Sequence, residues 1–201
     1  QLLIGEGKAK LASGEWLSGA DALKAVGLKP IVLAAKEGLS LINGVQFSCA
    51  YLAMAWIRAS RCLEFSNISA ATTLEALLGT DRAYDDRVQQ VRPHPGQAKV
   101  AARMRDLLAG SEIKESHIEC DRVQDAYSLR CVPQVHGAVM DSLNHIGEVL
   151  ERECNAATDN PLVFAEEGDV ISGGNFHGQP LAMVLDYASI AASELGNISD
   201  R

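Results

Sequence analysis

The stretch "VPQVHGAVMDSLNHIGEVL", residues 132–150, carries the clearest hydrophobic periodicity in the sequence. Its apolar residues recur at spacings of three and four, which is the pattern of an amphipathic α-helix of about five to six turns. They are Val132, Val135, Val139, Leu143, Ile146 and Leu150. Because a helix of this kind buries its apolar face against other elements, the stretch favours a mainly helical fold.

A second long stretch, residues 34–65, is apolar nearly all round and is interrupted only at Asn43-Gly44. This composition is typical of a helix through the centre of a helical bundle. Helical character continues over residues 66–79, and further helices are expected over 97–108 and from Gln179 to the end. Residues 80–97 contain many charges and two prolines, so they are expected to form a surface connection.

Two short β-hairpins are expected beside the helices. Four glycines punctuate residues 5–19, where the runs "AKL" and "EWL" resemble strands. Ser18 and Asp21 then form a weak capping signal for one short helix. Residues 162–174 read as two strands around a turn at Glu167-Gly168. The sequence thus predicts a mainly α fold with small β-hairpins, organised as a single unit over 1–201: a hairpin and short helix in 1–30, and a bundle in 31–201.

The charge and cysteine content exclude several classes of function. The formal net charge is −8 with no basic stripe, which argues against a nucleic-acid partner, and the arginine pairs near 58–61 and 103–105 are expected to be solvated or salt-bridged. No apolar run reaches the roughly 20 residues that a membrane span needs. The cysteines are Cys49, Cys62, Cys120, Cys131 and Cys154. Their wide spacing predicts reduced thiols in a cytoplasmic protein, and no residue spacing predicts a metal site.

Three polar interruptions of the apolar sequence are candidate site regions: residues 41–46, 123–137 and 172–180. They hold an amide that both donates and accepts (Asn43), a phenol (Tyr127), a guanidinium suited to a carboxylate (Arg130) and an apolar wall (Phe176). Simpler interpretations remain open, with Asn43 as a helix kink and Arg130 as a structural ion-pair partner. The sequence lacks a phosphate-binding loop and a G-x-S-x-G elbow.

Five segments, in order, carry a resemblance to a known family. They are "LLIGEGKA" (2–9), "AAKEGLSLINGVQ" (34–46), "QDAYSLRCVPQVHGA" (124–138), "NAATDNPLVF" (155–164) and "SGGNFHGQP" (172–180). Over essentially the whole chain, the sequence resembles the aromatic amino acid lyases, and among them the ammonia-lyases that act on histidine. The resemblance implies a long-helix bundle of the aromatic amino acid lyase or fumarase-like type, and a cytoplasmic homotetramer whose active sites draw on several subunits.

The same resemblance implies a reaction and roles for six residues. Members of the family eliminate ammonia from an amino acid, giving urocanate when the substrate is L-histidine, and their electrophile is methylidene-imidazolone (MIO), formed from an internal Ala-Ser-Gly. The implied catalytic residues are Asn43, which is also placed beside the MIO, and Tyr127. The implied substrate-binding residues are Gln124, Arg130, Asn160 and Phe176. Alternatives within the family are a tyrosine or phenylalanine ammonia-lyase or an aminomutase, although His136 and His177 favour histidine.

The tripeptide Ala12-Ser13-Gly14 has the same sequence as the MIO precursor, but it occupies a different position in the chain. In the family the cyclising tripeptide precedes the "LLIGEG" segment, whereas here it follows that segment, inside the expected hairpin. We therefore expect no MIO from these residues. The chain begins without Met and ends in a helical pattern, so it is expected to be an internal piece that is inactive alone. A rival of another class is a non-catalytic helical protein that uses the bundle for oligomerisation.

Overall fold

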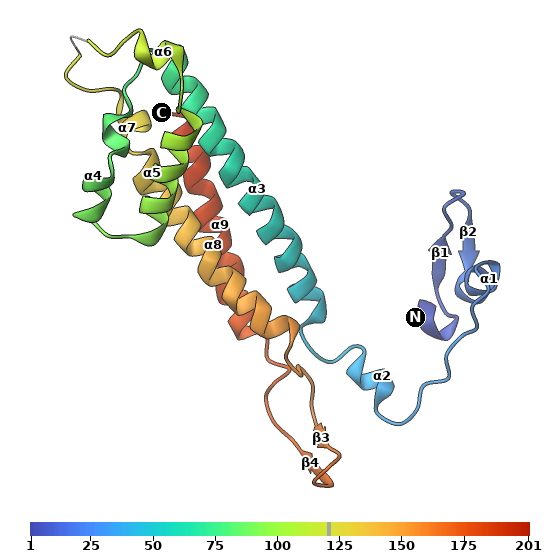
Figure 1. Ribbon diagram of the computed structural model, residues 1–201. Helices are drawn as coiled ribbons and strands as arrows, with labels where there is room; N and C mark the ends of the chain where they lie inside the picture. Colours follow the sequence, from blue (N-terminus) through green and yellow to red (C-terminus); the bar gives the residue numbers. More distant parts are fainter. Residues whose placement is uncertain (120–121) are drawn as a thin grey trace. The chain divides into compact units, whose positions relative to one another are not determined.

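The computed structural model describes residues 1–119 and 122–201 (Figure 1). Contacts within the chain form two compact units. Unit 1 comprises residues 1–44 and 159–176, and unit 2 comprises residues 45–158 and 177–201. The organisation expected from the sequence, one unit of a longer polypeptide, stays a prediction.

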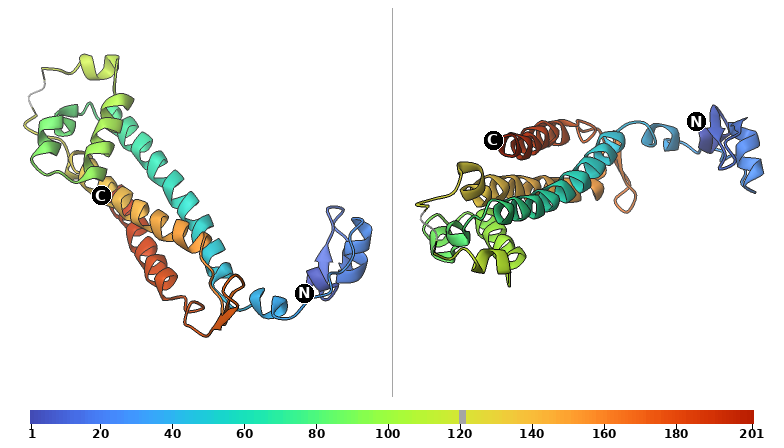
Figure 2. Two further views of the ribbon diagram at one scale, coloured as in Figure 1. Left: turned by 60° about the horizontal axis from the view of Figure 1, so that its bottom comes forward. Right: turned by 90° about the horizontal axis from the view of Figure 1, so that it is seen from above.

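Unit 2 is a helical bundle built on α8, which contains the periodic apolar stretch of residues 132–150. Its long helices are α3 (Gln46–Ala76), α5 (Pro95–Leu107), α8 (Val132–Cys154) and α9 (Gln179–Ser199). Helix α8 packs against the other three, and the views agree that α3, α8 and α9 lie side by side (Figures 1 and 2). Every residue of the predicted apolar face is buried except Val135, which is half-buried. The mainly α fold with two small hairpins is confirmed.

Helices α5 and α8 meet at two glycines. A Cβ added to Gly137 would lie 2.4 Å from the backbone nitrogen of Gln97, and one added to Gly96 would lie 2.1 Å from the carbonyl oxygen of Gly137. Asp141, one turn further along α8, accepts a hydrogen bond from the backbone N–H of Gly96 at 2.8 Å. Because no side chain fits in this contact, the two backbones can approach closely enough to bury Val100 between apolar neighbours.

Residues 80–97 are largely exposed and lead into α5, as the predicted surface connection would, but they are not irregular. They form the short helices η2 (Asp81–Tyr84) and α4 (Asp86–Gln90) before α5 begins. The Tyr84 ring is fully buried, and its hydroxyl donates to the backbone carbonyl of Leu129 at 2.9 Å. The charged residues of the segment are exposed or half-buried, whereas Tyr84, Gln89 and Gln97 are buried and attach it to the bundle. Two further short helices, α6 (Glu112–Glu115) and α7 (Tyr127–Arg130), complete this end of the bundle.

Unit 1 contains both hairpins. Strands β1 (Lys8–Lys10) and β2 (Trp16–Ser18) pair antiparallel, and so do β3 (Leu162–Phe164) and β4 (Asp169–Ile171). The capping signal is confirmed, since the Ser18 hydroxyl accepts from the backbone N–H of Asp21 at the start of α1 (Gly19–Ala25). The interruption at Asn43-Gly44 is real: helix α2 (Glu37–Ser40) ends before it and α3 begins after it.

Arginines of the 103–105 cluster form ion pairs, and the described cysteines form no disulfide. Arg103 pairs with Glu64 and Arg105 with Asp86, as the salt-bridge interpretation of that cluster predicted. The described cysteines are free thiols, and Cys120 lies outside the described residues.

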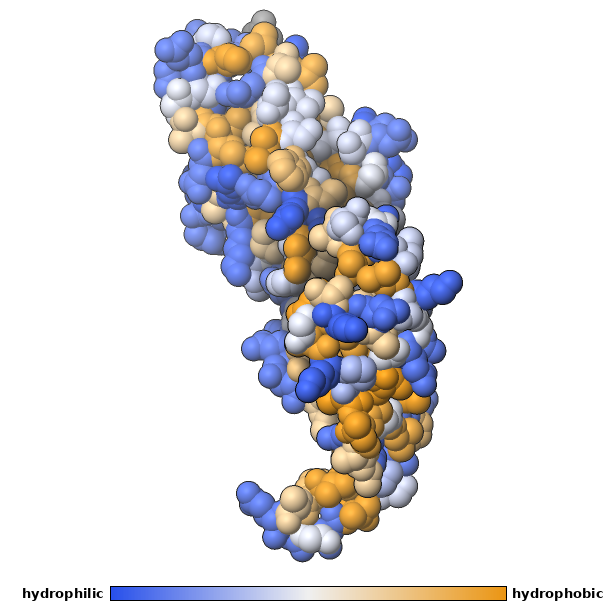
Figure 3. Space-filling model, turned by 90° about the vertical axis from the view of Figure 1, so that its right-hand side faces the viewer, coloured by the Kyte–Doolittle hydropathy of each residue, from blue (hydrophilic) through white to orange (hydrophobic). Residues whose placement is uncertain are grey.

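Many large apolar side chains are exposed, and Figure 3 shows them on one face of the molecule. On α3 alone, Phe47, Tyr51 and Met54 are each more than half exposed. Contiguous apolar surface on a protein usually marks a contact with another chain or segment. Among the described residues, no helix has both the length and the apolar character to cross a membrane.

Candidate functional site

The six residues that the resemblance singled out fall in both units. Asn43, Asn160 and Phe176 belong to unit 1, whereas Gln124, Tyr127 and Arg130 belong to unit 2. Within unit 1 the structure brings Asn43 and Asn160 into direct contact, although 117 positions separate them in the sequence. Phe176 is 44% exposed at the end of that unit. Within unit 2 the three residues lie on α7 and the segment that leads into it.

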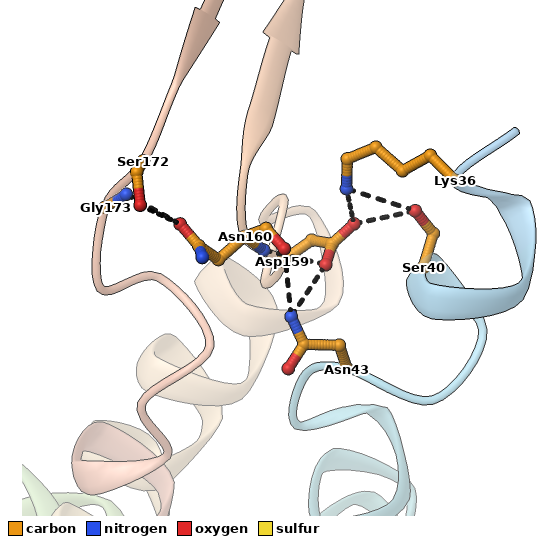
Figure 4. Close-up of polar contacts among 7 residues, drawn as sticks. All are labelled: Lys36, Ser40, Asn43, Asp159, Asn160, Ser172 and Gly173. Atoms are coloured by element: carbon orange, nitrogen blue, oxygen red, sulfur yellow. Dashed lines mark hydrogen bonds and ion pairs between the residues drawn. The ribbon is translucent and has the colours of Figure 1, made fainter.

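The contact in unit 1 is organised by Asp159, a residue that the sequence analysis did not single out (Figure 4). Its Oδ2 accepts from Lys36 Nζ at 2.5 Å and from Ser40 Oγ at 2.7 Å, and its Oδ1 accepts from Asn43 Nδ2 at 3.0 Å. Lys36 directly precedes helix α2 and Ser40 is its last residue, and both side chains reach the same carboxylate oxygen. Asp159 itself directly precedes Asn160, at the base of the β3–β4 hairpin.

The carboxylate of Asp159 is held in its charged form. The hydrogen bond from Lys36 is the main cause that keeps its pKa well below the usual range, followed by the hydrogen bond from Ser40. Only 15% of the Asp159 side chain is exposed, so these donors replace most of the water that would otherwise solvate it. An ionised carboxylate accepts hydrogen bonds and donates none, and this decides how its neighbours orient.

The orientation of the Asn43 amide follows from its two partners. Its Nδ2 donates to Asp159 Oδ1 and also to the backbone carbonyl oxygen of Asn160 at 3.2 Å. Both partners are acceptors only, so the nitrogen must face them and the oxygen must point away. Within the part of the chain that the structure describes, the Oδ1 of Asn43 has no hydrogen-bond partner. The half-buried Asn43 therefore presents a free acceptor.

Asn160 shows the opposite arrangement. Its Oδ1 accepts from Ser172 Oγ at 3.1 Å and from the backbone N–H of Gly173 at 2.8 Å, which fixes the amide oxygen toward β4 (Figure 4). Its Nδ2 makes no hydrogen bond with any described residue, so Asn160 presents a free donor. An acceptor and a donor held on a rigid frame suit a ligand that itself carries both, such as an amino acid.

In unit 2, Tyr127 is 69% exposed and lines a cavity of about 350 Å³ together with residues of α8 and α9. Arg130 is half-buried, and its Nε donates to the backbone carbonyl of Asp125 at 2.9 Å. No described carboxylate pairs with this guanidinium, so its terminal nitrogens are available for an anion. Gln124 is exposed.

His136, one of the two histidines whose motifs favour a histidine substrate, lies in the interior of unit 2. It is 3% exposed, inside the bundle, and its Nδ1 lies 2.8 Å from Asn67 Oδ1. Burial lowers its pKa from 6.5 to about 4. Because the amide oxygen of Asn67 is an acceptor, the neutral imidazole donates from Nδ1. This residue is a core histidine of unit 2.

The tripeptide Ala12-Ser13-Gly14 does not fit the MIO group. It forms the exposed tip of the β1–β2 hairpin, where the backbone N–H of Gly14 donates to the carbonyl of Leu11 at 2.9 Å. Ring closure needs that nitrogen to approach the carbonyl carbon of Ala12 under compression from surrounding structure. A Cβ built on Gly14 would meet no atom of the described residues within 4 Å, and all three residues of the turn are exposed, so the described structure does not compress this backbone.

Comparison with known proteins agrees with these features. The model of the aromatic amino acid lyase family matches residues 1–201, and the chain belongs to that family. Its relatives include histidine ammonia-lyases: the one from Sorangium cellulosum is 55% identical over 99% of this chain and 40% of the relative. The solved histidine ammonia-lyase from Trypanosoma cruzi is 42% identical with a TM-score of 0.88, covering 100% of this chain and 37% of that one.

The fold alone does not separate the branches of the family. The phenylalanine aminomutase from Pantoea agglomerans reaches a TM-score of 0.91 over 100% of this chain and 42% of its own, at 32% identity. The chain spans about two fifths of the length of the curated relatives that it matches.

Proposed function

We propose that this chain is part of a histidine ammonia-lyase, which eliminates ammonia from L-histidine and releases urocanate. The observation that carries the proposal is the sequence identity. It reaches 55% with a histidine ammonia-lyase along 99% of the chain. Among solved structures it is 42% with a histidine ammonia-lyase and 32% with an aminomutase, although their TM-scores are 0.88 and 0.91. Backbone similarity reports the shared fold, whereas side-chain identity tracks the chemistry of the site.

The described side chains supply groups for binding and orienting such a substrate. The guanidinium of Arg130 binds the substrate carboxylate through its terminal nitrogens, which form the planar fork that a carboxylate matches. Tyr127 contributes a phenol for proton transfer, and Gln124 and Phe176 line the substrate's surroundings. Asn43 and Asn160 contribute one free acceptor and one free donor. Preorganised polar groups of this kind need no rearrangement during the reaction, which lowers its barrier.

The family's MIO group supplies the electrophile that activates the substrate for loss of ammonia. We propose that it arises in the complete protein from a segment other than Ala12-Ser13-Gly14, because that turn does not enclose its backbone. Asn43 is the described residue assigned to the surroundings of the group. The exposed apolar side chains of α3 support assembly into the family's homotetramer, and the absence of basic stripes is consistent with a cytoplasmic enzyme of small molecules.

A substrate panel on the complete protein tests the proposal. L-Histidine, L-tyrosine and L-phenylalanine are supplied separately, and the unsaturated acid and ammonia are quantified for each. We expect L-histidine to give the highest kcat/KM and urocanate as the product. A preference for tyrosine or phenylalanine, or a β-amino acid product, would assign the chain to another branch of the family. Failure to act on all three, by a protein of intact oligomeric state, would support the non-catalytic rival.

A further inference from the structure

We propose that Asp159 is the positioning residue of this site: it holds Asn43 with the amide nitrogen inward, so that Asn43 serves the substrate's amino group as a hydrogen-bond acceptor. This inference rests on the proposed function and adds a residue and a direction to it. Neither was visible in the sequence, where Asp159 belonged to a segment that merely ended a helix.

The contacts with Asp159 and with the backbone of Asn160 fix the orientation of the Asn43 side-chain amide. If the amide were reversed, Asn43 Oδ1 would face the ionised carboxylate of Asp159 at 3.0 Å and the carbonyl oxygen of Asn160 at 3.2 Å. Two acceptor–acceptor contacts at these distances are repulsive, and both hydrogen bonds would be lost. The observed orientation is therefore the stable one as long as Asp159 stays charged.

Asp159 stays charged and stays in place. Lys36, the residue before helix α2, and Ser40, its last residue, both donate to Oδ2, while the backbone N–H of Asn160 donates to Oδ1 at 2.7 Å. Four donors thus converge on one carboxylate, two of them on each oxygen. The carboxylate cannot rotate without breaking several of these bonds, so Asn43 is held by a fixed neighbour.

The Oδ1 atom of Asn43 determines which group of a ligand this residue can bind. Its Oδ1 has two lone pairs and no partner among the described residues, so it can only accept. The amino group of an amino acid is a hydrogen-bond donor, both as ammonium and as free amine, whereas its carboxylate is not. Asn43 is therefore matched to the amino group and not to the carboxylate of an amino acid.

Two ligands that differ only in the amino group separate this role from a structural one. D-Histidine carries the ammonium, the carboxylate and the imidazole without being the L-substrate, and 3-(imidazol-4-yl)propanoate lacks the amine. Binding of each to the complete protein is measured by calorimetry for the wild type and for Asp159→Ala, Asp159→Asn and Asn43→Ala. The matched control is Asp169→Asn, which alters an exposed aspartate in the same unit.

We expect Asp159→Ala and Asn43→Ala each to lower the affinity for D-histidine about 10- to 100-fold, the range for a hydrogen bond to a charged group. The affinity for 3-(imidazol-4-yl)propanoate, which lacks the amine, should stay nearly unchanged. The variant that combines Asp159→Ala with Asn43→Ala should lose no more affinity for D-histidine than either single variant, because Asp159 acts through Asn43. Asp169→Asn should bind both ligands as the wild type does. If Asp159→Ala fails to fold, Asp159→Asn and Asn43→Ala give the same comparison.

Three results would overturn the inference. Equal weakening of both ligands would make Asp159 a structural residue only, and unchanged binding of both would make it irrelevant to the site. Additive losses in the double variant would show that Asp159 and Asn43 act independently. A wild-type protein that binds neither ligand would instead contradict the proposed function, and the inference would fall with it.

Discussion

Acidification should destabilise this protein through one buried residue, His136. The imidazole is 3% exposed and donates to Asn67, and burial lowers its pKa from 6.5 to about 4. Below pH 6.5 the unfolded chain binds a proton at this histidine, whereas the folded chain binds it only near pH 4. The unfolded state therefore gains protons first, and stability falls as the pH falls through this window.

The size of the effect follows from the two pKa values. Between about pH 7 and pH 5 the loss amounts to about 2 kcal/mol, and it approaches about 3 kcal/mol near pH 4. This is a large share of the roughly 5–15 kcal/mol that stabilises an ordinary domain. Above pH 7 the contribution of His136 is constant, because both states are then neutral at this position.

Urea unfolding at a series of pH values measures the loss. The informative comparison is between the wild type and His136→Gln, since glutamine can still donate an N–H to Asn67 but does not titrate. His145→Gln removes an exposed histidine from the same helix and controls for the substitution itself. The difference in stability between wild type and His136→Gln should shrink by about 2 kcal/mol from pH 7 to pH 5. Parallel pH profiles for the two proteins would refute the reasoning.

Four further substitutions test other parts of the structure. Gly137→Ala should destabilise by about 3 kcal/mol or more in thermal unfolding, because its Cβ would meet the α5 backbone, whereas Gly196→Ala in the open part of α9 should stabilise by up to about 1 kcal/mol. Tyr84→Phe should cost about 1–3 kcal/mol in urea unfolding by leaving a buried carbonyl without its donor, and a neutral result would contradict that hydrogen bond. Ser13→Ala should leave ammonia release by the complete protein unchanged; loss of activity would place the MIO in this turn after all.

Much of the fold was predictable because it depends on local signals. The spacing of apolar residues over 132–150 identified the buried face of α8, and Ser18 with Asp21 marked the start of α1. The break between α2 and α3 was visible as Asn43-Gly44 in an otherwise apolar run. In each case the residues that decide the structure lie within a few positions of one another, so the pattern can be recognised from the sequence without knowing any distant contact.

Contacts between distant parts of the chain cannot be predicted in this way. The polar composition of residues 80–97 predicts a surface connection, and most of them are exposed, but it does not show that the buried Tyr84 donates to Leu129, 45 positions away. The place of His136 in its motif favours a histidine substrate, but it does not show that Asn67, 69 positions away, is its partner in the core.

The candidate site shows the same division. The resemblance pointed to Asn43 and Asn160, but the residue that joins them was missed, because Asp159 lies 116 positions from Asn43 and its neighbours Lys36 and Ser40 resemble ordinary surface residues. Its only sequence signal was its place beside Asn160 in "TDNP". The direction of an amide cannot be read from residue types, since it depends on which acceptors the fold brings to each end.

The most direct test of the site is a crystal structure of the complete protein with D-histidine bound. The account predicts that Oδ1 of Asn43 lies within hydrogen-bond distance of the ligand's amino nitrogen, while Nδ2 keeps its contacts with Asp159 and Asn160. A ligand bound away from Asn43, or an Asn43 amide turned with its nitrogen toward the ligand, would contradict it.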